Sequence, residues 1–172
     1  MKHLIFFFGF LFFATVILAT DKWPQEPKGF RGIDFGTNES TARKTLGIQC
    51  IDSEGNRLCG GPAKIGDVDI TNTFLFLKDK LVQVSMTFDS DKFASIKAVF
   101  IEKYGEPMKV KKTTVQNQNG DNLEKESLAW ESDKVMVFLT RYSSDLTRGL
   151  ASIATQDWLD EVEKQQKGKG QN

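Results

Sequence analysis

The stretch 88–107 carries the strongest residue pattern in the chain and limits what the chain can fold into. Aspartate and serine at 89–91 supply capping oxygens and negative charge at a helix start, and Gly105 followed by Pro107 marks a helix end. Because strand-like runs lie on both sides of this predicted helix, we expect a sheet to wrap around it. The apolar residues between the two signals recur at steps of three or four, which is the spacing of one helix face: Phe93, Ile96, Phe100 and Tyr104.

The runs around the helix alternate with the two-residue period of strands that have one buried face. The sequence therefore predicts an α+β fold, in which an antiparallel sheet of about six to eight strands packs against one main helix. Shorter flanking helices are expected at Glu39 and Gln156, and Gly60-Gly61-Pro62 is expected to break the chain. In the clearest strand, one face carries Val82, Val84, Met86 and Phe88 and the other carries Gln83, Ser85 and Thr87.

Residues 110–131 are predicted to form a hairpin at one edge of the sheet. Asn119-Gly120 is a strong turn signal between two extended arms. The first arm, 110–118, is polar and rich in lysine, which is typical of an edge strand protected against pairing with another chain. Residues 134–142 are the most β-prone run in the chain, and we expect them to form a central strand.

The first twenty residues differ in composition from the rest of the chain and predict a signal peptide. A short basic start precedes an almost wholly apolar run, 4–19, which is short for a membrane-spanning helix. An uncleaved N-terminal anchor is the alternative. We therefore divide the chain into a signal peptide (1–20), a proline-stiffened lead-in (21–29), a single α+β domain (30–166) and a disordered polar tail (167–172).

Cys50 and Cys59 are the only cysteines, and they flank a short predicted hairpin with its turn at 53–56. Two cysteines placed nearly opposite each other in an exported chain favour a disulfide bond, with two free thiols as the alternative. A metal site would need more ligands than these cysteines provide, because the only histidine, His3, lies in the predicted signal peptide. We therefore expect neither a metal nor a cofactor.

Two parts of the chain share one plan: an extended run, a capped helix that ends in glycine, and then hairpins. The first helix ends at Leu46-Gly47 and the second at Tyr104-Gly105. Little residue identity accompanies the shared plan, so an internal duplication is a hypothesis based on the order of the predicted elements.

Two motifs resemble known groups of exported proteins. The segment 36–47 reads G-T-N-x-x-x-A-x-x-x-L-G, and it resembles the glycine, cap, helix and Leu-Gly signature of small exported modules such as the outer-membrane assembly lipoprotein BamE and the β-lactamase inhibitor protein. The start F-R-G-I-D-F-G-T (30–37), followed later by K-Y-G-E-P (103–107), is similar to a group of uncharacterised bacterial exported proteins. These resemblances imply an antiparallel sheet with helices on one face and transfer no catalytic residue. The lipid-anchoring cysteine of the assembly lipoproteins has no counterpart after the apolar run.

Composition and missing residue types argue against several functions. Basic and acidic residues number 23 each, so no excess of positive charge predicts binding to nucleic acid. Without histidine in the mature chain, no Ser-His-Asp or Cys-His catalytic arrangement can form. Asp67 and Asp69 lie two apart on a predicted strand and could act together in acid–base chemistry, although a solvated strand face explains them as well. The sequence therefore assigns no catalytic residue.

Aromatic and arginine residues in the second half of the chain are the candidate interface. Trp130, Arg141 and Tyr142 would gather on one sheet surface if their strands pair, and these residue types often anchor interfaces. For Trp130 the alternative is a place in the core. Trp158 begins an apolar stripe on the terminal helix, which either docks on the sheet or reaches a partner.

We therefore expect an exported binding or assembly module, periplasmic or secreted, that lacks enzymatic activity and binds an unidentified protein of the cell envelope. One alternative is a carrier that holds a small apolar ligand between sheet and helix. Another is an enzyme that uses only carboxylates. Membrane contact is expected only if the N-terminal segment stays uncleaved.

Overall fold

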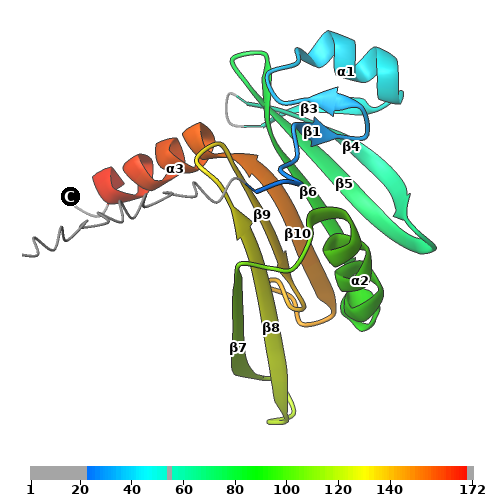
Figure 1. The fold of residues 1–172 in the computed structure, drawn as a ribbon, viewed down its shortest axis with the longest axis vertical. Helices are drawn as coiled ribbons and strands as arrows, with labels where there is room; N and C mark the ends of the chain where they lie inside the picture. Colours follow the sequence, from blue (N-terminus) through cyan, green and yellow to red (C-terminus); the bar gives the residue numbers. More distant parts are fainter. Residues whose placement is uncertain (1–22, 54–55, 170–172) are drawn as a thin grey trace, which may run out of the picture.

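The computed structural model describes residues 23–53 and 56–169. This part of the chain is α+β, with one eight-stranded antiparallel sheet, three helices and a separate two-stranded ribbon (Figure 1). The fold class and the antiparallel sheet predicted from the sequence are confirmed. The signal peptide predicted at 1–20, the middle of the turn predicted at 53–56 and the last three residues lie outside the described part of the chain.

The strands of the large sheet lie in the order β3-β4-β5-β6-β10-β9-β8-β7, so β3 and β7 are its two edges. The helices are α1 (Glu39–Leu46), α2 (Phe93–Tyr104) and α3 (Gln156–Lys169), and a short 3-10 turn, η1 (Ser90–Lys92), precedes α2. The ribbon is β1 (Gly29–Phe30) with β2 (Ile33–Asp34). The sheet strands are β3 (Gln49–Ser53), β4 (Asn56–Ile65), β5 (Val68–Leu77), β6 (Lys80–Asp89), β7 (Lys109–Gln116), β8 (Asn122–Glu131), β9 (Val135–Thr140) and β10 (Arg148–Thr155).

The order of the elements repeats within the sheet. Unit one (39–89) is α1 followed by the meander β3 to β6, and unit two (93–155) is α2 followed by the meander β7 to β10. The last strands of the two units, β6 and β10, pair with each other at the centre of the sheet. Both helices end at a glycine with positive φ, 65° at Gly47 and 80° at Gly105, a backbone region that favours a residue without a Cβ. The plan inferred from the sequence is therefore present in the topology.

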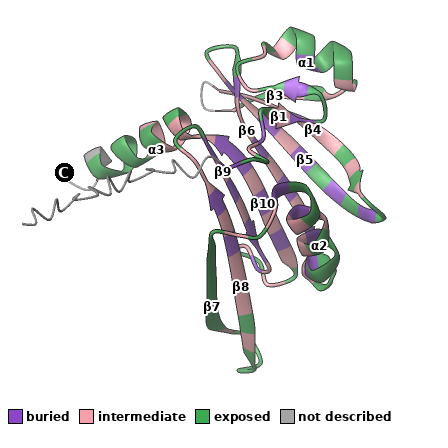
Figure 2. Cartoon of the chain, viewed as in Figure 1, coloured by how far each residue is buried: buried purple, intermediate pink, exposed green. Residues whose placement is uncertain are grey.

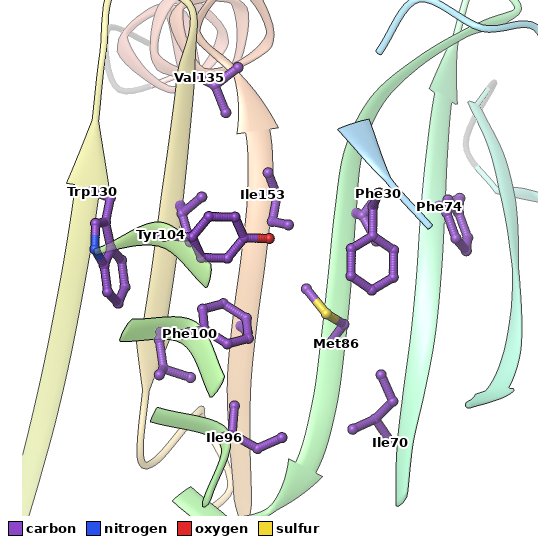
Figure 3. Close-up of a cluster of buried hydrophobic side chains, with 14 of the residues drawn as sticks. Phe30, Ile70, Phe74, Met86, Ile96, Phe100, Tyr104, Trp130, Val135 and Ile153 are labelled. Carbon is purple, nitrogen blue, oxygen red and sulfur yellow. The ribbon is translucent and has the colours of Figure 1, made fainter. Parts of the chain in front are cut away.

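Helix α2 buries the four residues that its spacing predicts, Phe93, Ile96, Phe100 and Tyr104. The ring centroids of Phe100 and Tyr104 are each 6.3 Å from the ring centroid of Trp130 on β8 (Figure 3). Helix α3, with 14 residues, is longer than α2, with 12, so α2 is not the dominant helix by length.

The hairpin and strand order predicted for unit two agree with the structure. Strand β7 is an edge strand, and β9 lies inside the sheet between β10 and β8. At the turn, the Asn117 side-chain oxygen accepts hydrogen bonds from the backbone N–H groups of Asn119 and Asp121, both within 2.9 Å. These side-chain bonds close the turn that Asn119-Gly120 indicated.

The face predicted for residues 82–88 is wrong at one position. Leu81, and not Val82, is buried. The pairing of β5 with β6 shifts its register between Leu75 and Phe76. Such a bulge adds one residue to a strand, so the alternation of inward and outward side chains changes phase at that point.

The break expected at Gly60-Gly61-Pro62 is also wrong, because these residues lie inside β4. A Cβ on Gly60 would lie only 2.1 Å from the backbone oxygen of Asn72 on β5. Asn72 is buried, and its side-chain oxygen accepts a hydrogen bond from the Gly61 N–H at 3.2 Å. Gly60 therefore allows a close approach between β4 and β5, and the strand continues through all three residues.

The lead-in at 21–29 is more than an exposed connection. Trp23 is buried, its ring packs edge-on against Tyr104, and its Nε1–H donates a hydrogen bond to the Tyr104 backbone oxygen at 2.8 Å. At the other end, α3 continues to Lys169, beyond the domain boundary expected at residue 166.

Candidate interaction surface

The large sheet has two unlike faces. One, the core face, carries the buried cluster that includes residues of α2 and of the β1–β2 ribbon (Figure 3). On the other, which we call the open face, most of the intervening residues of the same strands are half-buried or exposed, and Thr140 and Ala154 are buried (Figure 2). The register links Ser85 on β6, Ser152 on β10 and Phe138 on β9 directly across this face. The open face is therefore a continuous surface that spans both units.

The centre of the open face combines apolar and hydroxyl side chains. In β5, β6 and β10 its charged residues lie at the strand ends, where Lys64 pairs with Asp69 and Arg148 pairs with Asp89. A half-exposed apolar sheet surface with charges at its border has the composition of many protein interfaces. Its central residues include Leu58, Leu75, Ser85, Ser152, Leu150 and Phe138.

The predicted interface residue Trp158 contacts one end of the open face. Its Nε1–H donates a hydrogen bond to the Gln83 side-chain oxygen at 3.1 Å, and Gln83 in turn donates to the Ser152 hydroxyl at 2.8 Å. A cleft of about 330 Å³ lies beside Trp158, lined also by Leu77 and Val82. From Gln156 to Lys167 no α3 residue is fully buried, so this helix is only partly covered by the rest of the described chain.

Trp130, by contrast, lies in the core and is fully buried. Its Nε1–H donates a hydrogen bond to the Gly105 backbone oxygen at 2.8 Å, just beyond the end of α2. This placement agrees with the core alternative, and in this structure the side chain cannot contact a partner.

Arg141 and Tyr142 do not join Trp130 on one surface. Trp130 pairs with Val137 on β9, whereas the Arg141 N–H donates to Glu126, nearer the opposite end of β8. Tyr142 is buried, and the Arg141 guanidinium carbon lies 5.3 Å from the centre of its ring. The structure therefore does not bring the four predicted interface residues together.

A groove of about 500 Å³ lies on the open face at the unit-two end of the sheet. Phe138 and Ala129 line it together with Val115, while the side chains of Lys111 and Lys125 bring positive charge to it. Sequence reasoning missed Phe138, because the run 134–142 was interpreted as one β-prone segment. In the structure that run alternates, with Val135, Val137 and Leu139 buried and Met136 and Phe138 half-buried, but all five residues are apolar, so the sequence carries no signal for the outward face.

The two carboxylates considered for acid–base chemistry lie in different elements. Asp67 lies in the turn before β5, whereas Asp69 lies on the strand and pairs with Lys64 at 2.8 Å. That hydrogen bond raises the pKa of Lys64 above its ordinary value. A solvated strand surface accounts for Asp69 in this setting.

One group of three possible metal ligands occurs among the described residues, Glu39 with Cys50 and Cys59. The two sulfurs form a disulfide bond across β3 and β4, so neither is a thiolate. Glu39 accepts hydrogen bonds from Arg57, which lower the pKa of its carboxyl. The donor set therefore does not fit a metal ion while the disulfide is intact.

A lysine beside the lead-in has an altered pKa. Burial lowers the pKa of Lys103, whose Nζ lies 5.5 Å from the centre of the Phe30 ring and 5.3 Å from that of Tyr104. Burial also raises the pKa of Tyr104. Contact of an ammonium group with two ring faces is a cation–π arrangement, which accounts for the position of Lys103 without a catalytic role.

The chain matches no protein-family model, no curated protein and no solved structure. The resemblances to exported modules drawn from the two sequence motifs thus stay predictions. No helix among residues 23–53 and 56–169 is long and apolar enough to cross a membrane.

Proposed function

We propose that this chain is an exported, non-enzymatic binding module that holds a protein partner on the open face of its sheet. The observation that carries the proposal is the open face itself, which Trp158 of α3 contacts at one end and whose centre combines apolar and hydroxyl side chains. Large apolar surfaces rimmed by polar residues are typical of protein interaction sites.

The two-unit topology supports this use of the sheet. Both α2 and the ribbon β1–β2 contribute to the core cluster on one face, so the eight strands are free to present the other. A rigid sheet presents its side chains at fixed spacing, which lowers the entropy cost of binding. The same layout is what the resemblance to exported assembly and inhibitor modules implies, and we retain that resemblance as part of the proposal.

Export is supported by the basic and apolar start at 1–20 and by the bond between Cys50 and Cys59. Disulfide bonds form and persist in the periplasm and outside the cell, so we place the protein in one of these compartments. The single main helix expected from the sequence belongs to the same proposal, with α2 as the support that keeps the sheet rigid behind its open face.

The ligand-carrier alternative receives less support. A ligand held between sheet and helix would have to displace Ile96, Phe100 and Tyr104, which are buried there. An enzyme that uses only carboxylates receives less support as well, since Asp67 and Asp69 are exposed and Asp69 pairs with Lys64.

Site-specific photo-crosslinking in the envelope of cells that produce the protein tests the proposal. A photoreactive phenylalanine analogue at Phe138 or at Leu150, both on the open face, is expected to capture the same partner. The analogue at Glu102, an exposed position on α2, is the control and is expected not to capture the partner that Phe138 and Leu150 capture.

The captured protein is then purified and its affinity measured by titration. Phe138→Ser and Leu150→Ser are expected to weaken binding by about tenfold or more, as central interface residues do, while Glu102→Ser leaves it unchanged. Equal capture from both sides of the molecule, or unchanged affinity in both open-face variants, would show that the open face is not the binding surface. Turnover of an ester, peptide, glycoside or phosphate substrate by the pure protein would contradict the proposal that the module lacks enzymatic activity.

A further inference from the structure

Strand β7 is a second, separate candidate for recognition. It is the outermost strand of the sheet, so its outer side has no neighbouring strand among the described residues. All eight of its residues are exposed except Val115, which is half-buried. We propose that β7 binds an extended peptide segment as an added ninth strand, and that the segment alternates acidic and apolar residues.

The backbone of β7 provides the first part of the argument. An edge strand presents unpaired N–H and C=O groups, and an extended peptide can pair with them to continue the sheet. The strand is eight residues long, whereas the opposite edge strand, β3, has five. A longer edge offers more main-chain hydrogen bonds, so β7 is the better template of the two.

The charges of β7 select an acidic partner. Lys109 and Lys111 lie on the open face, and Lys112 lies on the other side of the strand. Lys109 pairs with Glu131, and Lys112 lies 3.2 Å from a Glu124 oxygen, so β8 partly neutralises both. Lys111 has no ion pair within the described part of the chain. The same holds for Lys125, which lies on the open face of β8, two residues from the Ser127 that pairs with Lys111. An acidic side chain beside Lys111 would therefore meet uncompensated positive charge.

The opposite side of β7 selects an apolar neighbour. Val110 is 54% exposed, and Met108, just before the strand, is 50% exposed. In an added strand, the residue beside Val110 points to the same side of the sheet, so a valine or isoleucine there would bury apolar surface on both strands. The two sides of β7 together specify alternation, with acidic residues beside Lys111 and apolar residues beside Val110.

The same charges disfavour a second copy of β7 as the added strand. Pairing β7 with itself would place lysine near lysine along the new edge, and like charges opposite each other destabilise a sheet. Lysines on an edge strand thus disfavour self-association and remain compatible with an acidic partner.

This inference does not depend on the function proposed for the open face. The added strand would contact the outer edge and backbone of β7, whereas the proposed partner covers the centre of the sheet, and the two sites adjoin at the groove that Lys111 and Phe138 line together. Either site can fail its test while the other passes.

The experiment uses the purified protein with the disulfide intact and a synthetic heptapeptide, Thr-Glu-Val-Glu-Val-Glu-Thr, with blocked ends. The comparison peptide has the same composition in blocks, Thr-Val-Val-Glu-Glu-Glu-Thr. The dissociation constant is measured by fluorescence anisotropy, and the site by amide chemical shifts of the labelled protein. We expect the alternating peptide to bind about tenfold more tightly than the block peptide, with shifts centred on Lys109–Gln116.

Two variants and two modified peptides separate strand addition from simple charge attraction. Lys111→Glu is expected to weaken binding of the alternating peptide about tenfold, while Lys44→Glu, an exposed lysine on α1, leaves it unchanged. One modified peptide carries N-methyl groups on its glutamates, and the other carries them on its valines. Alternate N–H groups of an added strand point toward β7, so one of these two peptides should lose binding and the other should keep it. Equal binding of the two N-methylated peptides, no preference for alternation, no effect of Lys111→Glu, or occupation of β7 by another copy of this chain would each overturn the proposal.

Discussion

The two units of the sheet repeat one topology but protect their outer strands by different means. In unit one, a disulfide bond joins edge strand β3 to β4, and the Arg57 side chain on β4 bonds to Glu39 on α1 and to Asp52 on β3. In unit two, β7 has no covalent link and no ion pair to a helix among the described residues. Its own edge is lined by lysines.

The units also differ in how their helices are attached. Helix α1 fully buries only Ala42, whereas α2 buries four large side chains, two of which pack on Trp130 of β8. The attachment of α1 to its strands therefore depends mainly on polar links, whereas the attachment of α2 depends on packing in the core together with an ion pair from Lys97 to Glu126 on β8. An identical order of elements thus does not imply an identical source of stability, and each of the following predictions tests one side of that difference.

Removal of Trp130 should have the largest effect, because this residue ties β8 to α2. Trp130→Ala is expected to lower the free energy of unfolding by about 3–5 kcal/mol, from the cavity and from the lost hydrogen bond to Gly105. Trp130→Phe keeps most of the volume and should cost about 1–2 kcal/mol. Denaturant unfolding measures both values. A loss below about 1 kcal/mol for the alanine variant would show that unit two does not depend on this packing.

Loss of the disulfide should have the next largest effect and should be confined to unit one. Replacing both Cys50 and Cys59 by alanine is expected to lower the free energy of unfolding by about 2–3 kcal/mol. The value is modest because the two cysteines are only nine positions apart, and a short loop gains less from a disulfide bond than a long one. Hydrogen exchange should accelerate in β3 and β4 and stay unchanged in β7 and β8. Equal acceleration at both edges would contradict the division of the sheet into separately secured units.

Local residue patterns predicted much of this fold correctly. The lysine-rich arm and the Asn119-Gly120 turn identified an edge hairpin, because turn chemistry and edge protection are properties of a short segment. The spacing of the buried residues of α2 was correct for the same reason, and so was the pairing of the two cysteines across β3 and β4.

What the sequence missed depends on neighbours distant in the chain. The bulge that buries Leu81 in place of Val82 belongs to a strand pair, and the glycines of β4 acquire their role only beside Asn72. Trp130 could be assigned to the core only once α2 was placed against it. The open face likewise emerges when strands from both units pair, so Phe138 could not be recognised as a surface residue from its own β-prone segment.

The Glu39–Arg57 pair makes the stability of unit one depend on pH. The hydrogen bond from Arg57 lowers the pKa of Glu39 below its ordinary value of 4.5, so the pair stabilises the folded chain above that pH. This contribution is lost as the pH falls through the lowered pKa. Between about pH 5 and pH 3, the melting temperature of the wild type should therefore fall more steeply than that of Glu39→Gln. Parallel curves would show that the ion pair adds nothing, and high salt should reduce any difference because the pair lies near solvent.

The lysines of β7 should affect association rather than stability. Their replacement should cause the smallest change in unfolding free energy that we predict. Replacing Lys109, Lys111 and Lys112 by threonine should alter that free energy by less than about 0.5 kcal/mol, because all three side chains are exposed. The same change removes the repulsion between two β7 edges, so the variant should form dimers or larger species in sedimentation experiments. A variant with threonine at Lys28, Lys44 and Lys92, which are exposed and lie outside the sheet, controls for the change in net charge and should stay unassociated. If both variants associate equally, net charge and not the edge of unit two keeps the chains apart.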